Sequence, residues 1–319
     1  MSRYDITTGR AGAHLGAAGG PTGPPTIQGN GKMPNVRRTA LAAAEPLRLN
    51  DGTAIPALGL GTFGFKGDRG VGILSRALAS GYRLLDTAVG YDTEAEVGRA
   101  VRESGVPRDE IVVTTKIRRP GHGYDAARRS VRASLDRLGL ERVDLYLIHW
   151  PNPRLGLYVD TWRALVDARA DGEVRSIGVS NFNANHLERI VDATGEVPAI
   201  NQIELHPHFP QERARALHRQ LGIRTQSWSP LGLGGRATLA AEPVTDAARR
   251  HGATPAQVVL RWHQQLGCIP IPRSSDPERQ RENLRLGRLQ LDEDELRAIT
   301  SLGRSGGRLW GGDPETEER

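Results

Sequence analysis

The feature that most constrains this fold is a pattern that repeats eight times, a short apolar stretch followed by an amphipathic helical stretch. The repeats fill about 250 residues. Strands that alternate with helices favour a parallel sheet, because two parallel strands need a long crossover between them. Eight such units are the number that closes a barrel. The chain is therefore predicted to be an α/β protein, a single (β/α)8 TIM barrel.

The elements can be placed by their apolar periodicity. Strands are predicted at 58–62, 82–88, 110–117, 143–150, 174–181, 199–205, 223–231 and 268–274. Helices are predicted at 71–81, 94–105, 124–139, 160–172, 184–194, 212–222, within a longer stretch that contains 256–267, and at 277–287. An N-terminal β-hairpin with an Asp-Gly turn is predicted at 46–58, and an extra helix and a glycine-rich loop at 292–314.

The stretch GLGTFG, residues 59–64, raises one alternative, an open doubly wound sheet. It fits G-x-G-x-x-G, and Asp86 follows about 20 residues later, as in dinucleotide-binding folds. In those folds the helix opens at the glycines, whereas here the helical pattern begins only near Val71. We interpret the glycines as a tight exit from the first barrel strand.

The chain is predicted to have two parts. Residues 1–45 carry few large apolar side chains, too few to offset the entropy of ordering, and are predicted to be a disordered N-terminal extension. Residues 46–319 are predicted to form the barrel domain. Met33 stands near the boundary, which suggests an alternative translation start that the intact mass of the native protein would test.

The composition limits the cellular compartment and the classes of partner that are expected. Cys268 is the single cysteine, so an internal disulfide is excluded and a reducing compartment is expected. No apolar run reaches the roughly 18 residues of a membrane span. The net charge is +6, and half of it lies in the extension, which has five basic and two acidic residues. We expect a cytoplasmic monomer without membrane or nucleic-acid partners; DNA binding through the extension is a minor alternative.

Four polar residues stand where predicted strands end, which is where barrel enzymes place their active sites. Asp86 ends the second strand and Tyr91 lies in its loop, whereas Lys116 and His149 end the third and fourth. Each alone could be structural: a helix cap, a loop aromatic, a solvated lysine or a core histidine. Their convergence on one rim favours a shared function. Lys116 is also one of only three lysines among 43 basic residues, which indicates that an ammonium is needed there.

Together the four side chains could form a proton-donating unit. A tyrosine hydroxyl has an ordinary pKa of about 10, and an adjacent ammonium lowers it. We expect Lys116 to lower the pKa of Tyr91, and Asp86 to hold the lysine by an ion pair. His149, neutral and donating one N–H, would orient a carbonyl oxygen beside the Tyr91 hydroxyl.

These residues stand in the contexts RLLDTAVGY, VVTTK and LIHWP, and GVSNF, NQIELHPH, SPLG and IPRSSDPERQREN follow. With these motifs the chain, from about residue 46 to its end, resembles the aldo-keto reductase family. It is most similar to bacterial members of the diketogluconate-reductase type. The resemblance implies a barrel enzyme that binds NADPH (NADP+) across the strand ends and reduces aldehydes or ketones to alcohols. It also implies Tyr91 as proton donor, Asp86 and Lys116 as its modulators, and His149 as the residue that orients the carbonyl.

The resemblance also implies where the nicotinamide half of the cofactor binds. Trp228 ends the seventh strand and offers a flat face for the ring. The polar residues implied are Ser180, Asn181 and Gln202 at the carboxamide, and Thr62 and Asp86 at the ribose.

At the other half of the cofactor the resemblance implies a phosphate site, for which arginine is suited because guanidinium binds phosphate in a bidentate fork. The residues implied are Ser229, Leu231 and Gly232 at the pyrophosphate, Arg273, Ser274 and Arg279 at the 2′-phosphate, and Glu282 and Asn283 at the adenine.

Three positions depart from the family pattern. Arg273 stands where lysine is usual, and Trp228 where tyrosine is commoner. After Tyr91 the sequence reads DTEAEVG in place of GNEEGVG. Arg273 in place of lysine puts the strength of the NADP preference in doubt. The changed sequence after Tyr91 puts the shape of that loop in doubt. His149 is the family residue, which favours carbonyl over carbon–carbon double-bond reduction.

The substrate and metal predictions rest on fewer residues. Phe63, Trp150 and Trp310 are expected to form an apolar wall around a small carbonyl substrate. His206 and His208 are two imidazoles without a third ligand nearby in sequence, so no metal site is expected. The alternative to an enzyme is a regulatory module that binds a nicotinamide cofactor with little turnover.

Overall fold

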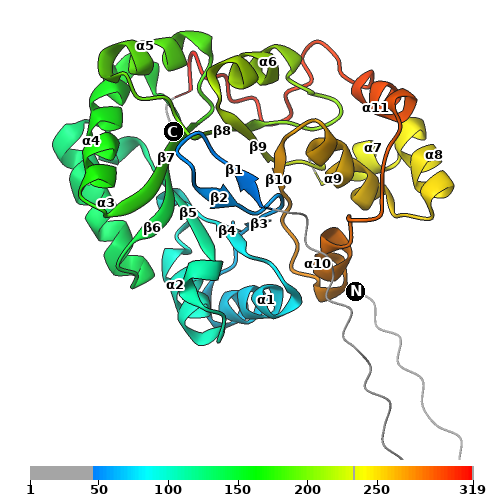
Figure 1. Ribbon diagram of the computed structural model, residues 1–319, viewed down its shortest axis with the longest axis horizontal. Coiled ribbons are helices and arrows are strands. Elements are labelled where there is room, and N and C mark those ends of the chain that lie inside the picture. Colours follow the sequence, from blue (N-terminus) through cyan, green and yellow to red (C-terminus); the bar gives the residue numbers. More distant parts are fainter. Residues whose placement is uncertain (1–45, 233, 318–319) are drawn as a thin grey trace, which may run out of the picture. The chain divides into compact units, whose positions relative to one another are not determined.

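The computed structural model describes residues 46–232 and 234–317, shown in colour in Figure 1. The predicted disordered extension, residues 1–45, lies outside the described residues.

Eight parallel strands form the central sheet in the order of the sequence. They are β3 (Leu60–Gly61), β4 (Leu84–Asp86), β5 (Val112–Ile117), β6 (Val143–Ile148), β7 (Val174–Ser180), β8 (Ile200–Glu204), β9 (Arg224–Trp228) and β10 (Ile269–Ile271). The first and last strands meet, because the amides of Gly59 and Gly61 donate to the carbonyls of Pro270 and Pro272, both over 3.1 Å. The predicted (β/α)8 barrel is confirmed.

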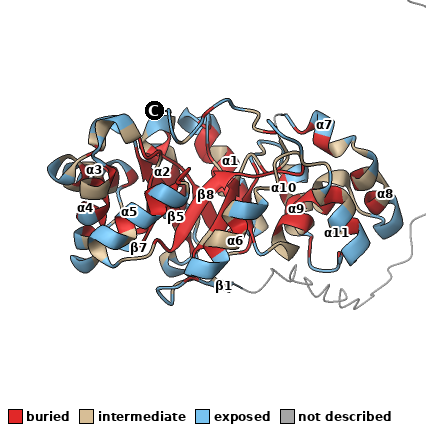
Figure 2. Cartoon of the chain, turned by 90° about the horizontal axis from the view of Figure 1, so that it is seen from above, coloured by how far each residue is buried: buried red, intermediate tan, exposed pale blue. Residues whose placement is uncertain are grey.

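Helices surround the barrel, and in Figure 2 their exposed residues face outward while the strands are buried. Those that follow strands are α1 (Gly67–Ser80), α2 (Glu94–Glu103), α3 (Tyr124–Leu138), α4 (Tyr158–Ala170), α5 (Ala184–Thr194), α6 (Glu212–Leu221), α9 (Pro255–Gln265) and α10 (Pro277–Leu284). Three more are α7 (Arg236–Leu239), α8 (Glu242–His251) and α11 (Glu293–Thr300). Among the described residues no helix is long and apolar enough to cross a bilayer.

The predicted hairpin closes one end of the barrel. Its strands β1 (Leu47–Arg48) and β2 (Ala54–Ile55) pair antiparallel across the Asp-Gly turn. Figure 1 shows it in front of the sheet. Leu49 and Ile55 of the hairpin pack in one buried cluster with strand residues such as Ile200 and Ile269, the first residues of β8 and β10. Because the hairpin and the amino ends of the strands share this core, the carboxyl ends of the strands are left for a site.

Two helical stretches differ most from the sequence interpretation. Helix α1 begins at Gly67, four residues before Val71, because the amide of Gly67 donates to Glu96 of α2 over 2.8 Å. That partner lies far along the chain, so local periodicity could not reveal it. The long helical stretch of the seventh repeat is also divided, into α7, α8 and α9.

The glycines of GLGTFG serve the barrel. A Cβ on Gly59 would lie 2.5 Å from Cδ1 of Ile271 and 2.8 Å from Cγ of Leu84, so only glycine fits between these strands. Gly64 has a φ of +76°, which other residues rarely adopt. The glycines therefore form the tight strand exit that the sequence predicted, and the open doubly wound sheet is excluded.

Candidate functional site

A buried ion pair forms the centre of the site. Lys116, at the end of β5, donates to Asp86 Oδ1 over 2.6 Å and to the Thr87 carbonyl over 2.9 Å. The two charged side chains are 0% and 4% exposed. A charge pair this deeply buried needs additional hydrogen bonds to offset its lost hydration. Asp86 has one, because Gln202 Nε2 of β8 donates to its other oxygen over 2.8 Å.

Tyr91 lies directly beside this pair, in the short 3-10 turn Val89–Tyr91 that follows β4. The Lys116 ammonium is 5.0 Å from the centroid of the Tyr91 ring. The same ring makes edge-to-face contacts with Phe63 (centroids 5.3 Å apart) and with His149 (5.6 Å). The four residues predicted from three separate strands therefore lie together at one rim.

The electrostatics differ in one respect from the sequence expectation. Burial raises the pKa of Tyr91, and the Asp86 carboxylate raises it further, whereas Lys116 lowers it. Lys116 thus lowers the pKa of Tyr91 as the sequence predicted, but the net shift is upward, because the loss of hydration outweighs the ammonium. Burial works against the charge of Lys116, but Asp86 and Tyr91 outweigh it and raise the pKa of the lysine. The lysine is therefore charged and the tyrosine protonated at neutral pH.

A second network joins the ends of β7, β8 and β9. Asn181 Nδ2 donates to the His149 carbonyl (3.0 Å), and Asn181 Oδ1 accepts from Trp228 Nε1 (2.9 Å). Ser180 donates to the Gln202 carbonyl over 2.9 Å. Asn181 has a φ of +62°, a left-handed conformation that asparagine tolerates better than most residues. The structure thus brings together Ser180, Asn181, Gln202 and Trp228, and links them to His149.

Thr62 lies differently from the cofactor prediction. It is fully buried, and its hydroxyl shares a 3.3 Å hydrogen bond with Thr93, which in turn bonds Thr87 over 2.9 Å. Its hydroxyl is therefore already paired inside the protein, and contact with a ribose stays a prediction.

Further along the rim, the loop after β9 holds three of the predicted residues. Ser229 has a φ of +49° and Gly232 a φ of +75°, and the Gly232 amide donates to the Ser229 carbonyl over 2.8 Å. Leu231 is partly buried between them. This turn is tightly folded, whereas its contact with a pyrophosphate stays a prediction.

The predicted 2′-phosphate residues lie at the end of β10 and on α10. Arg273 and Arg279 are exposed, and Ser274 is half-buried. Arg273 Nε donates to the Phe63 carbonyl over 2.6 Å, and its guanidinium lies 4.7 Å from the centroid of the Phe65 ring. Arg273 thus already contacts the loop that carries a predicted substrate residue.

The two predicted adenine residues are less open than expected. The Glu282 carboxylate accepts from the Thr254 hydroxyl, and the Glu282 carbonyl from Gln257 over 3.1 Å. Asn283 is 4% exposed and lines a hollow that also reaches Tyr82. Their contact with adenine stays a prediction.

The three predicted substrate residues differ in exposure. Phe63 and Trp310 are 61% and 47% exposed, whereas Trp150 is 4% exposed. A Cβ on Gly312 would lie 2.7 Å from the Trp150 ring, so the C-terminal residues cover this tryptophan. Trp150 therefore cannot form an open wall in this conformation.

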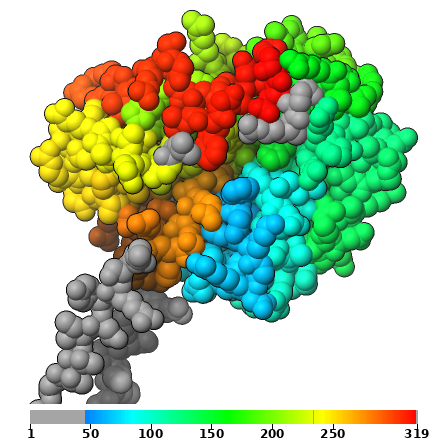
Figure 3. Space-filling model, turned by 180° about the vertical axis from the view of Figure 1, so that it is seen from behind, coloured from blue at the N-terminus to red at the C-terminus, as the bar shows by residue number. Residues whose placement is uncertain are grey.

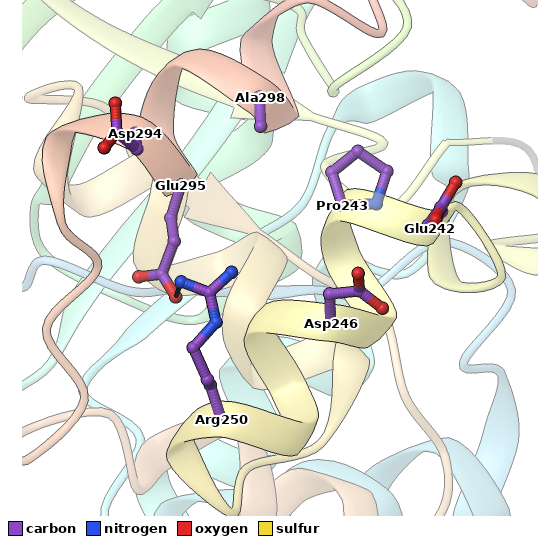
Figure 4. Close-up of a pocket in the computed structure, with 7 residues that line it drawn as sticks. All are labelled: Glu242, Pro243, Asp246, Arg250, Asp294, Glu295 and Ala298. Carbon is purple, nitrogen blue, oxygen red and sulfur yellow. Dashed lines mark ion pairs between the residues drawn. The ribbon is translucent and has the colours of Figure 1, made fainter.

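Two hollows lie away from Tyr91 and its neighbours. One, of about 250 Å³, separates α8 from α11, where Figure 4 shows acidic side chains on both helices and Arg250 beside Glu295 (3.1 Å). The other, of about 390 Å³, lies beside the hairpin and is lined by Pro46, Ala54 and Tyr82 among others. Neither contains a member of the Asp86–Tyr91–Lys116–His149 group. Within 46–232 and 234–317 no three metal-ligating side chains come together.

Sequence reasoning missed two contacts at the rim. Gln202 was assigned to a cofactor, but its amide bonds Asp86 and, over 2.5 Å, Gln226. Glu204 was not singled out, although it is buried at the end of β8 and accepts the Leu309 amide over 2.7 Å. Alternate side chains of a strand face the same side, so Ile200, Gln202 and Glu204 of β8 share one face. This alternation is the signal that could have identified both residues.

Comparisons with known proteins agree with this geometry. The family model described as Aldo/keto reductase family matches residues 57–304. The chain is 55% identical to 2,5-diketo-D-gluconic acid reductase B of Corynebacterium sp. (strain SHS752001) over 85% of this chain and 97% of that protein. It also resembles the crystal structure of a Gox0644 point mutant in complex with NADPH (44% identity, TM-score 0.82, 86% of this chain and 100% of that one). A Bombyx mori aldo-keto reductase solved with NADP is 36% identical, with a TM-score of 0.76, and the match covers 82% of this chain and 93% of that one.

Proposed function

The chain belongs to the aldo/keto reductase family, and from that premise we propose that it reduces aldehydes and ketones to alcohols with NADPH. The observation that carries the proposal is the buried Lys116–Asp86 pair beside Tyr91 and His149. The solved relatives in complex with NADPH or NADP support the choice of cofactor.

The residues of the rim fit a nicotinamide cofactor in their chemistry. Trp228 offers an aromatic face of partial exposure, with Ser180 and Asn181 beside it as hydrogen-bonding groups. Arg273 and Arg279 are exposed cations that suit a phosphate. We assign the nicotinamide to the first group and the 2′-phosphate to the second. When bound, the reduced nicotinamide supplies a hydride.

Tyr91 acts as the proton donor in this proposal. Its raised pKa keeps the hydroxyl protonated, which reduction requires. As the proton leaves, the nearby Lys116 ammonium stabilises the phenolate that forms, and Asp86 with Gln202 keeps the lysine in place. The edge-to-face contact with Tyr91 holds His149 where its ring N–H can bind the carbonyl oxygen. Each role uses a contact that exists before any ligand binds.

A spectrophotometric assay tests the proposal. The full chain is mixed with NADPH and a panel of aldehydes and ketones. The panel includes 2,5-diketo-D-gluconate, the compound for which the Corynebacterium relative is named. Loss of reduced-nicotinamide absorbance with at least one carbonyl is expected. Tight NADPH binding without turnover on any carbonyl would instead favour a regulatory module. If the protein neither binds NADPH nor reduces any carbonyl, both the enzyme and the regulatory module are refuted.

Two further expectations concern the state of the protein. We propose that it acts as a monomer in the cytoplasm on a small-molecule carbonyl. Light scattering after size exclusion tests the first part, and fractionation of the native cells tests the second.

A further inference from the structure

The C-terminal segment, defined as residues 304–317, crosses the carboxyl ends of the strands. Figure 3, seen from the side opposite Figure 1, shows these residues in red on that face. The Arg304 amide donates to the His208 carbonyl over 3.4 Å. A Cβ on Gly307 would lie 1.9 Å from the same carbonyl oxygen, so this glycine rests directly against the backbone.

The same segment covers the proposed cofactor and substrate residues. Its Trp310 contacts the Trp228 ring, with centroids 6.5 Å apart and the rings inclined by 62°. Cδ1 of Leu309 lies 3.4 Å from where a Cβ on Gly232 would stand. Access to the strand ends therefore depends on where this segment lies.

One side chain holds the segment from inside the barrel. Glu204, the last residue of β8, is 1% exposed, and its Oε1 accepts the Leu309 amide over 2.7 Å and His206 Nε2–H over 3.2 Å. Its Oε2 has no hydrogen-bond partner among the described residues. His206, its neighbour, is fully buried as well.

This bond carries more weight than an ordinary loop contact. A hydrogen bond to a charged acceptor is stronger than one between neutral groups, and a buried carboxylate that loses a donor is costly. The Glu204 carboxylate has only two donors among the described residues, and one of them belongs to the C-terminal segment. When the segment is closed, Leu309 supplies one of the two donors to Oε1; when the segment lifts, that donor is lost.

We propose that Glu204 is a positioning residue, which holds the C-terminal segment closed by accepting the Leu309 amide. It thereby sets the width of the opening through which a carbonyl compound reaches Tyr91. The second part of the inference rests on the proposed function, whereas the first part does not.

Limited trypsin digestion of the full chain without ligands tests the first part. The segment contains two tryptic sites, Arg304 and Arg308, and cleavage there measures how often the segment is open. We expect Glu204→Ala to speed this cleavage by about tenfold or more. Glu204→Gln keeps an acceptor oxygen but not its charge, so its cleavage rate should lie between those of wild type and Glu204→Ala.

Glu94→Ala is the matched control, because Glu94 is a buried glutamate on α2 whose partners are Thr115 and Arg137. It should lower stability without speeding cleavage at Arg304 and Arg308. If Glu204→Ala and Glu94→Ala open the segment equally, the effect is general loosening and the proposal is overturned.

A second variant acts from the segment side and leaves Glu204 intact. Gly307→Ala cannot keep its contact with the His208 carbonyl and should free the segment as Glu204→Ala does. Ser305→Ala, an exposed neighbour, is its control. Should Glu204→Ala fail to fold, the proposal requires that Gly307→Ala raise the cleavage rate and Ser305→Ala leave it unchanged. Wild-type resistance in Gly307→Ala would overturn it.

Kinetics test the second part. We expect Glu204→Ala and Trp310→Ala each to raise kcat/KM for a bulky aldehyde several-fold relative to a small one. The double variant should gain less than the product of the two, because both changes act through the same segment. If trypsin shows that the segment is open in a variant, but the ratio of kcat/KM for the bulky and the small aldehyde is unchanged, the role of the segment in selectivity is overturned. If no carbonyl is reduced by any variant, the proposed function fails, and the trypsin result still decides whether Glu204 holds the segment.

Discussion

The two sides of the barrel rim differ in how far they are built before a ligand arrives. On β4 to β6 the Lys116–Asp86 pair is buried and hydrogen-bonded, and Tyr91 and His149 pack beside it. On β10 and α10 the two arginines Arg273 and Arg279 are exposed to water.

The difference fits the roles proposed for the two sides. Groups that move a proton work best when they are fixed and shielded from water, since each interaction is then stronger and needs no rearrangement. Groups that attract a phosphate can stay hydrated, because an exposed positive charge still guides an anion by long-range attraction. Changes on the buried side should therefore cost far more than changes on the exposed side.

The largest effect is expected on the buried side, from Tyr91→Phe. Without the hydroxyl no proton can be donated, so turnover should fall by about 10²- to 10⁴-fold. NADPH should bind as before, which a fluorescence titration checks. Tyr124→Phe, which removes an exposed hydroxyl bonded to Asp167, should keep full turnover. Retained activity in Tyr91→Phe would remove this residue from the donor role.

The two paired lysines compare buried and exposed charges directly. Lys116→Met leaves Asp86 without its ion-pair partner inside the barrel, and the free energy of unfolding should drop by about 3–5 kcal/mol. Lys66→Met breaks an exposed pair with Asp92 and should change it by less than about 1 kcal/mol. Urea unfolding measures both, and equal losses would contradict the contrast.

Acid should destabilise the protein through its buried neutral histidines. Burial lowers the pKa of His218 to about 4 and that of His263 to about 3. Below about pH 6.5 these residues take up protons in the unfolded chain but not in the folded one. The free energy of unfolding therefore decreases as the pH is lowered. Each should cost about 2 kcal/mol between pH 7 and pH 5.

Urea midpoints at the two pH values check this. His218 bonds Asn201 and Thr225. A His218→Gln variant should therefore be less stable at pH 7 but lose about 2 kcal/mol less on acidification than the wild type. Identical midpoints for the wild type at pH 5 and pH 7 would show that these histidines are not buried as described.

The smallest effect is expected on the exposed side. Arg279→Gln should raise the Kd for NADPH about tenfold, the value of one charge-assisted hydrogen bond, and leave the Kd for NADH unchanged. Arg281→Gln is the control, since Arg281 is on the same helix but pairs with Glu278 over 2.6 Å. If both variants lose NADPH affinity equally, α10 attracts the cofactor only through its overall charge.

The elements of the barrel could be predicted because each depends on local order. Apolar periodicity placed the strands, and the residues that end them, Asp86, Lys116 and His149, meet at one rim by the geometry of any parallel barrel. The start of α1 could not be predicted, because Glu96 of another helix satisfies the Gly67 amide. The role of Gln202 was missed for the same reason, since Asp86 lies 116 residues away.

The sequence by itself determined the fold class and the family, and it predicted which side chains carry the chemistry. Periodicity and motif order are properties of residues near one another in the chain, so they can be read from the sequence without a structure. Only the tertiary structure decided how these side chains are tuned. The direction of the Tyr91 pKa depends on the balance between its burial and the Lys116 charge, and the closure over Trp150 depends on where the C-terminal segment packs. Burial and long-range contacts are sums over the whole chain, so no local stretch contains them.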